Sequence, residues 1–187
     1  MKYVSADLET LGLDSDWCDI IEFGAVLDDL EELKPLEELP RFHAYLVKNQ
    51  YKGEPYAMSM HSKILKRISD RESGYTYITP DKLGSAFKKF LINNGYEEHK
   101  QKVSINIAGK NFMSFDDHFL NNLPNFKKHI NIRSRSLDPA ILFFEKGDQK
   151  LPSLGECLKR AGLEKEVSHT SIEDSLDVVK LIRKKMA

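Results

Sequence analysis

Several features that would mark a secreted or membrane protein are missing from this chain of 187 residues. It has only two cysteines, Cys18 and Cys157, without paired spacing, so no disulfide framework is expected. It lacks an apolar N-terminal stretch that resembles a signal peptide, and it lacks an apolar run long enough to span a membrane. These absences predict a reducing compartment, the cytoplasm, and no membrane partner.

An excess of charge of one sign is also lacking. Lysine and arginine together number 28, and aspartate and glutamate 29, which gives a formal net charge of −1. A protein that coats nucleic acid is expected to be strongly basic, so this class is disfavoured. The length fits one domain over residues 1–187, large enough to bury about two thirds of the surface that the unfolded chain exposes.

Hydrophobic alternation predicts five strands, at residues 2–9, 20–27, 41–47, 103–107 and 130–137. Apolar residues at helical spacing and cap residues predict helices at 62–68, 80–94, 139–144, 153–162 and 171–185, and one that ends at residue 123. Short turns join the first three strands, whereas helices separate the later ones. This order predicts an α/β protein with a mixed five-stranded sheet flanked by helices.

Two carboxylates, Asp7 and Glu9, lie two residues apart in the first predicted strand. Side chains at this spacing share one face of a strand, and Val4, Ala6 and Leu8 lie on the other face. Like charges this close raise each other's pKa unless a cation neutralises them. Because oxygen-only ligands suit Mg²⁺ or Mn²⁺ better than Zn²⁺, the pair is a candidate metal site.

Two further acidic blocks follow later in the chain. The first ends in Asp116, at the exit of the fourth predicted strand. In the second, Thr170 and Glu173 fit a capping box that would start the last helix. This places His169 just before the helix and Asp174 in its first turn, so the imidazole would lie beside the carboxylate. The helix dipole favours the ionised form of Asp174, as a metal ligand requires.

Together these blocks resemble the motifs of the DEDDh branch of the DnaQ-like 3′-5′ exonucleases, the group that includes proofreading subunits, RNase T and oligoribonuclease. Residues 7–13 match the first motif, 111–120 the second and 169–174 the third. The stretches 19–26 and 151–158 are similar to the family's second strand and to the helix before its third motif. The resemblance covers nearly the whole chain and implies an RNase H-like fold.

The resemblance also implies a mechanism. Two divalent cations, Mg²⁺ or Mn²⁺, would be held by Asp7, Glu9, Asp116 and Asp174. His169 would act as the general base on the attacking water, and a nucleoside 5′-monophosphate would leave from the 3′ end. Two bound cations would bring four positive charges to the phosphate, so a net charge of −1 is compatible with this reaction.

Substrate contacts are expected beside the acidic motifs, with the 3′ end of single-stranded DNA or RNA as the partner. The resemblance implies that the backbone around Thr10 and Leu11 lies near the 3′ hydroxyl. The second block adds Asn111, Phe112 and Phe115 as candidates. A phenylalanine there can stack on a terminal base, although core packing is the default for any single one.

Several alternatives stay open at the level of sequence. Asp117 directly follows Asp116, and the apolar residues around Asp116 favour it over its neighbour. The acidic stretch 28–40 is longer than the turn usual in the family and has no assigned role. A homodimer is compatible with the chain, as is a proofreading or nucleic-acid-binding subunit that acts through a polymerase or another partner. The remaining histidines are interpreted as structural or surface residues, namely His43, His61, His99, His118 and His129.

Overall fold

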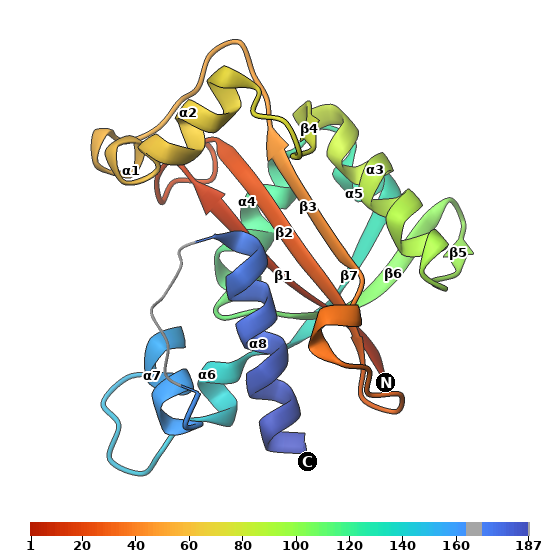
Figure 1. Ribbon diagram of the computed structural model, residues 1–187, viewed down its shortest axis with the longest axis vertical. Helices are drawn as coiled ribbons and strands as arrows, with labels where there is room; N and C mark the ends of the chain where they lie inside the picture. The colour runs from red at the N-terminus through yellow and green to blue at the C-terminus, as the bar shows by residue number, and fades with distance from the viewer. Residues whose placement is uncertain (164–169, 187) are drawn as a thin grey trace.

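A mixed β-sheet forms the centre of the computed structural model, which describes residues 1–163 and 170–186 (Figure 1). The strands follow the order β4-β3-β2-β1-β6-β5, and β7 pairs with β6. Their bounds are β1 Lys2–Thr10, β2 Ile20–Asp29, β3 Arg41–Leu46, β4 Tyr77–Ile78, β5 Glu98–His99, β6 Lys102–Ala108 and β7 Ile130–Leu137. The five longer strands confirm the five predicted from the sequence, and β4 and β5 add two short strands of two residues each.

The register of the sheet brings a further carboxylate to the predicted pair. β1 is antiparallel to β2, and β2 to β3, whereas β6 runs parallel to both β1 and β7. Across the first pair, Glu9 lies opposite Glu22, and Asp7 lies opposite Gly24. Directly opposed residues point to the same face of a sheet. Asp7, Glu9 and Glu22 therefore share one face.

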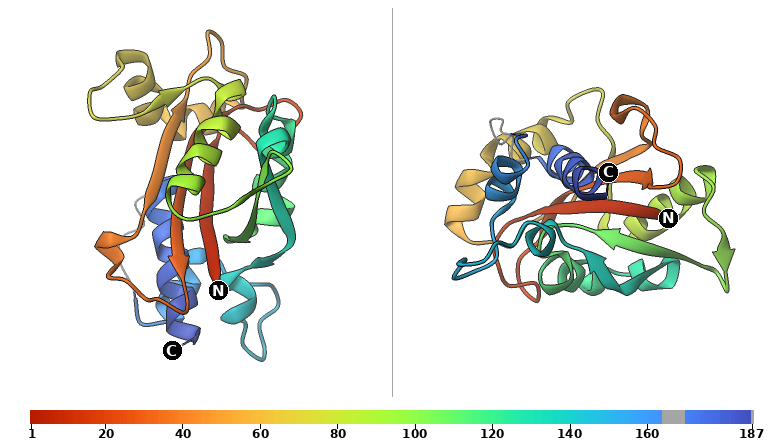
Figure 2. Two further views of the ribbon diagram at one scale, coloured as in Figure 1. Left: turned by 90° about the vertical axis from the view of Figure 1, so that its right-hand side faces the viewer. Right: turned by 90° about the horizontal axis from the view of Figure 1, so that it is seen from below.

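Helices cover both faces of this sheet (Figure 2). On one face lies α8, whose Val178 packs in a cluster with Tyr3. On the other face lie α3, α4 and α5, which contribute Phe87, Phe119 and Phe126 to the largest core cluster. The helix bounds are α1 Pro55–Met60, α2 Ser62–Asp70, α3 Pro80–Asn93, α4 Asp116–Asn122, α5 Phe126–His129, α6 Pro139–Leu142, α7 Leu154–Arg160 and α8 Ser171–Met186, with 3-10 turns η1 Leu36–Glu38 and η2 Phe112–Ser114.

Cap residues place several helix boundaries where the sequence predicts them. Pro80 is the first residue of α3, and Gly95, with φ of 79°, follows its end. The capping box of α7 is present, since Ser153 N–H donates to Glu156 (2.6 Å) and Glu156 N–H donates to the Ser153 hydroxyl (3.3 Å). The helix expected over 139–144 is shorter, because α6 ends at Leu142.

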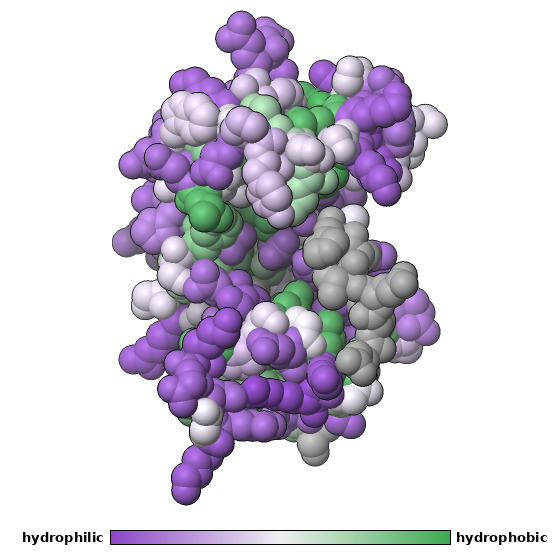
Figure 3. Space-filling model, turned by 90° about the vertical axis from the view of Figure 1, so that its left-hand side faces the viewer, coloured by the Kyte–Doolittle hydropathy of each residue, from purple (hydrophilic) through white to green (hydrophobic). Residues whose placement is uncertain are grey.

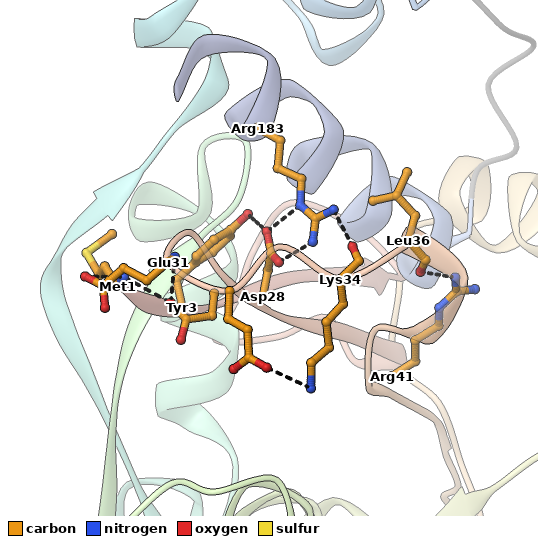
Figure 4. Close-up of polar contacts among 10 residues, drawn as sticks. Met1, Tyr3, Asp28, Glu31, Lys34, Leu36, Arg41 and Arg183 are labelled. Carbon is orange, nitrogen blue, oxygen red and sulfur yellow. Dashed lines mark hydrogen bonds and ion pairs between the residues drawn. The ribbon is translucent and has the colours of Figure 1, made fainter. Parts of the chain in front are cut away.

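The acidic stretch 28–40 contacts the C-terminal end of α8 (Figure 4). Arg183 donates to both oxygens of Asp28, at 2.9 and 2.5 Å, and to the carbonyl of Lys34 at 2.7 Å. The Tyr3 hydroxyl donates to the same carboxylate at 2.7 Å. The Asp28 side chain is 0% exposed and that of Arg183 is 16% exposed, so this is a buried, hydrogen-bonded ion pair. The acidic stretch 28–40 thus helps to hold α8 against the sheet, a role that the sequence does not reveal.

Among the described residues, no helix is both long enough and apolar enough to cross a membrane.

Candidate active site

Three carboxylates meet at the N-terminal end of α8. Asp7 and Glu9 come from β1 and Asp174 from the first turn of α8, and one oxygen from each lies within 4.8 Å of the others. Oxygen donors at this spacing match hard cations such as Mg²⁺ and Mn²⁺. Figure 3 shows the side of the molecule on which α1 and α7 lie in Figure 1. On this side the surface is hollowed between the upper part, which contains α1 and α2, and the lower part, which contains α7.

Buried serines fix the first turns of α8 against the sheet. Ser171 donates to Glu22 at 2.9 Å, and Ser5 donates to the carbonyl of Ser175 at 2.7 Å. Ser175 in turn donates to the carbonyl of Gly24 at 3.2 Å. Glycine is needed there, because a Cβ on Gly24 would lie 2.5 Å from the backbone of Ser171. This close approach of helix and strand sets the position of the helix that carries Asp174.

The start of α8 differs in detail from the predicted capping box. α8 begins at Ser171, as Thr170 at the N-cap requires. The N–H of Glu173 bonds the carbonyl of Thr170 at 3.1 Å, and the Thr170 hydroxyl donates to the Glu173 carboxylate at 3.3 Å. The two side chains therefore bond each other. His169, the proposed general base, lies outside the described residues.

Glu22 adds a buried carboxylate next to this cluster. Its side chain is 0% exposed, and its Oε1 lies 2.8 Å from His43 Nε2 and accepts from Ser171. Its Oε2 is buried without a hydrogen-bond partner among the described residues. Glu22 therefore joins β3, β2 and the start of α8 at one point. The sequence gives no signal for this contact, since it depends on strand register.

Asp116 lies against β1, the strand that carries Asp7 and Glu9. It is the first residue of α4, is buried, and accepts a hydrogen bond from the N–H of Leu8 at 3.2 Å. Asp117 instead accepts from the Asn121 side chain of its own helix at 2.7 Å. Of the two neighbours, Asp116 is thus the one whose side chain reaches β1, in the register preferred from the sequence.

Three of these carboxylates, Asp7, Glu9 and Asp116, hold protons more tightly than ordinary acids. Burial raises the pKa of Asp7 well above its usual value, and the charges of Asp116, Glu9 and Asp174 raise it further. Burial raises the pKa of Glu9 to about 8, with added repulsion from Glu22. Burial also raises the pKa of Asp116 to about 7, against the lowering effect of its backbone hydrogen bonds. Bound cations would relieve this repulsion.

The second motif forms a strained turn between β6 and α4. Asn111 is exposed and adopts a left-handed backbone conformation with φ of 61°. Its N–H donates to Asp138 at 2.9 Å, and the other oxygen of Asp138 caps α6 through Ala140 N–H at 2.8 Å. Phe112 is buried in the core, and Phe115 is partly buried beside Phe119, with ring centroids 5.1 Å apart.

The side chains of the loop after β1 differ in their exposure. The Thr10 hydroxyl donates to the carbonyl of Gly12 at 2.8 Å, and Leu11 is fully buried against α2. Leu13, two residues further on, is 77% exposed, and Tyr56 on the neighbouring α1 is 79% exposed. The backbone of Leu11 bonds the N–H of Glu54 at 2.7 Å, which ties this loop to the start of α1.

A second histidine lies at the cluster. His61 Nε2 is 3.6 Å from Glu9 Oε2, and the residue is 6% exposed. It stands between α1 and α2, where it ends the first helix and precedes the second. A single histidine between two short helices carries no sequence signal for such a position, and the sequence-based interpretation of His61 as an ordinary structural residue misses this contact.

The fold and the acidic cluster define a protein of the RNase H-like exonuclease class, and comparison with known proteins agrees. The sequence profile of the family RNase_T, described as exonuclease, matches residues 4–182. The chain therefore belongs to this exonuclease family. No curated protein sequence matches the chain.

Solved structures of nucleases share the fold. Cell-death related nuclease 4 (CRN-4) is 16% identical with a TM-score of 0.65, over 98% of this chain and 62% of its own. Exonuclease I of E. coli in complex with a dT13 oligonucleotide is 16% identical with a TM-score of 0.63, over 97% and 40%. The Pan2 catalytic unit of Neurospora crassa, with protease and nuclease domains, is 17% identical with a TM-score of 0.60, over 98% and 26%. The chain thus spans between about a quarter and three fifths of these proteins.

Proposed function

We propose that this protein is a 3′-5′ exonuclease of the DEDDh type, which hydrolyses single-stranded DNA or RNA from the 3′ end to nucleoside 5′-monophosphates. The observation that carries the proposal is the convergence of Asp7, Glu9 and Asp174 within 4.8 Å in a chain of the exonuclease family. Asp116 supplies the fourth carboxylate, from the start of α4. Exonuclease I, which shares the fold, is shown with an oligonucleotide bound.

The donor set fits divalent metal ions of the Mg²⁺ or Mn²⁺ class. Asp7, Glu9, Asp116 and Asp174 would hold two such ions, since four carboxylates offer only oxygen ligands and their mutual repulsion favours cations. When bound, the ions would supply positive charge to the phosphate and lower the pKa of the attacking water. The serine contacts of α8 and the Leu8 contact of Asp116 orient these ligands.

The protein's histidines would handle the proton and orient a ligand. His169 would accept the proton of the attacking water, because a neutral imidazole is available near its reference pKa of about 6.5. It precedes the helix that carries Asp174, which suits a base beside the cluster. His61 would orient the Glu9 carboxylate, which lies 3.6 Å from its Nε2. Leu13 and Tyr56 offer exposed apolar surface for the terminal base, with the backbone at Thr10 and Leu11 toward the 3′ hydroxyl.

Degradation of labelled single strands tests the proposal. With Mg²⁺ or Mn²⁺, a 5′-labelled DNA or RNA oligonucleotide should yield a ladder that shortens from its 3′ end, and a 3′-labelled one should release labelled mononucleotide at once. Chelation should stop both reactions. Asp7→Ala should be inactive, while Asp117→Asn, whose partner is Asn121, serves as the matched acidic control. Absence of divalent-dependent degradation of DNA and RNA alike would overturn the proposal, and activity only in a co-purified complex would favour a proofreading subunit.

A further inference from the structure

A cavity of about 450 Å³ lies outside the carboxylate cluster. Four segments line it: the loop between β1 and β2, the connection after β3, the start of α3 and the end of α4. Trp17, Lys52 and Asn122 are among the lining residues. The volume lies in the range of small-molecule sites and is sufficient for one nucleotide.

Trp17 is an exposed aromatic side chain on a well-fixed loop. It is the only tryptophan of the chain and is 48% exposed. Its N–H and that of Cys18 bond the carbonyl of Asp14 at 3.2 and 2.7 Å. The Asn122 side chain donates to the carbonyl of Ser15 at 2.9 Å and so ties the loop to α4. Because the backbone of the loop is fixed, an aromatic ring there has only its two side-chain torsions to lose when it binds a partner, which costs little conformational entropy.

The charges of the cavity favour a base over a run of phosphates. Asp19 is occupied by Lys48 at 2.5 Å and by the N–H of Lys52 at 2.7 Å, and Asp16 by Asn122 at 2.9 Å. Among the described residues, the ammonium of Lys52 forms no ion pair. It can meet one phosphate, whereas Asp81, which also lines the cavity, would repel a series of them. The ring of Trp17 is then the main source of affinity.

α4 connects this cavity to the carboxylate cluster. It begins at Asp116, and Asn122 at its end lines the cavity. Six residues of helix span about 9 Å. A stacked strand that rises about 3.4 Å per nucleotide covers this distance in about three nucleotides. A mononucleotide or dinucleotide bound at the carboxylates would therefore end short of Trp17.

We propose that this cavity is a subsite for a base of the single strand, about three nucleotides to the 5′ side of the scissile phosphate, and that Trp17 stacks on that base. The inference rests on the proposed exonuclease function. It makes single strands longer than a dinucleotide the substrate class of this protein. A base stacked on an aromatic ring is tolerated in any sequence, so the subsite selects for length and not for sequence.

Intrinsic fluorescence reports on this subsite directly, because Trp17 is the only tryptophan. The full chain with Asp7→Ala, which binds without cleavage, is titrated with a single-stranded octamer, a dinucleotide and a 5′-mononucleotide. The octamer should quench the emission of Trp17, and the two short ligands should not. Octamer binding, followed by anisotropy of a labelled strand, without quenching would overturn the subsite. Equal quenching by the mononucleotide would overturn it too, since the cavity would then be a separate nucleotide site.

Kinetics supply the second test. Trp17→Ala should raise the KM for the octamer, relative to the KM for the dinucleotide, by about 5- to 150-fold, and Trp17→Phe should restore part of this ratio. Phe144→Ala removes an exposed aromatic ring from the connection after α6 and should leave the ratio as in the wild type. Cleavage of both substrates with an unchanged ratio in Trp17→Ala would overturn the subsite alone. Failure of the wild type to cleave either substrate would overturn the exonuclease function itself.

Discussion

The ion pair between Asp28 and Arg183 allows a sharp test of what holds α8 in place. Arg183→Met keeps most of the side-chain volume and removes the guanidinium, so the fully buried Asp28 loses its two hydrogen bonds from Arg183. The hydrogen bond from Arg183 to the carbonyl of Lys34 is lost with them. A buried carboxylate without its partner costs about 3–5 kcal/mol. Because the free energy of unfolding of domains of this size is about 5–15 kcal/mol, the variant should lose a large part of its stability.

The measurement is urea unfolding followed by Trp17 fluorescence, with Arg41→Met as the matched control. The Arg41 guanidinium donates to the carbonyl of Leu36 at 2.9 Å at an exposed position, so its loss should cost about 0.5 kcal/mol or less. The double variant Asp28→Leu with Arg183→Met should recover at least about 2 kcal/mol, because no unpaired charge remains buried. A cost below about 1 kcal/mol for Arg183→Met, or no recovery in the double variant, would refute the reasoning.

The same pair predicts how stability depends on pH. Burial by itself would raise the pKa of Asp28, but hydrogen bonds from Arg183 and Tyr3 outweigh it and leave this pKa below its usual value. The pair therefore contributes its full stability above the unfolded-state pKa of about 3.9. This contribution is lost as the pH falls through the lower folded-state pKa. Wild type should lose stability more steeply than the double variant below about pH 4.

Three further predictions concern the candidate active site. Asp7→Ala should abolish divalent-dependent cleavage and keep the fold, and near wild-type turnover or an unfolded far-UV spectrum would contradict its role as a metal ligand. Asp116→Asn should lose activity and Asp117→Asn should keep it, since only Asp116 reaches β1; the reverse pattern would move the ligand by one residue. His169→Ala should slow the reaction by about 10²- to 10⁴-fold and remove the acid limb of the pH-rate profile under saturating metal; an unchanged acid limb would exclude His169 as the base.

Local patterns were sufficient to predict the elements that carry the site. The period of two in β1 places Asp7 and Glu9 on one face, and the cap residues place the start of α8 beside Asp174. Such signals depend on residues close together in the sequence. They therefore predict the five long strands and the helix that presents Asp174, and the family resemblance supplies their arrangement.

Contacts between distant segments were not predictable in the same way. Glu22 joins the cluster through strand register, and His61 reaches Glu9 because two short helices pack over the end of the sheet. Leu11 is buried, whereas Leu13 is exposed, a difference decided by packing of the loop against α1 and α2. The role of stretch 28–40 depends on Arg183, about 150 residues away in sequence.

The adjacency of β1 and α8 has a consequence for biosynthesis. Ser5 on β1 bonds Ser175 on α8, 170 residues later. The site is therefore complete only after α8, the last helix, has packed against β1, the first strand. Chains are made from the N-terminus, and earlier segments can fold while later ones are still being synthesised. A nascent chain that has not yet reached α8 carries Asp7, Glu9 and Asp116 but lacks Asp174. Under the proposed mechanism, such a chain would leave the ribosome, close to ribosomal and messenger RNA, with its active site still incomplete. The topology thus delays nuclease activity until the last helix has been synthesised.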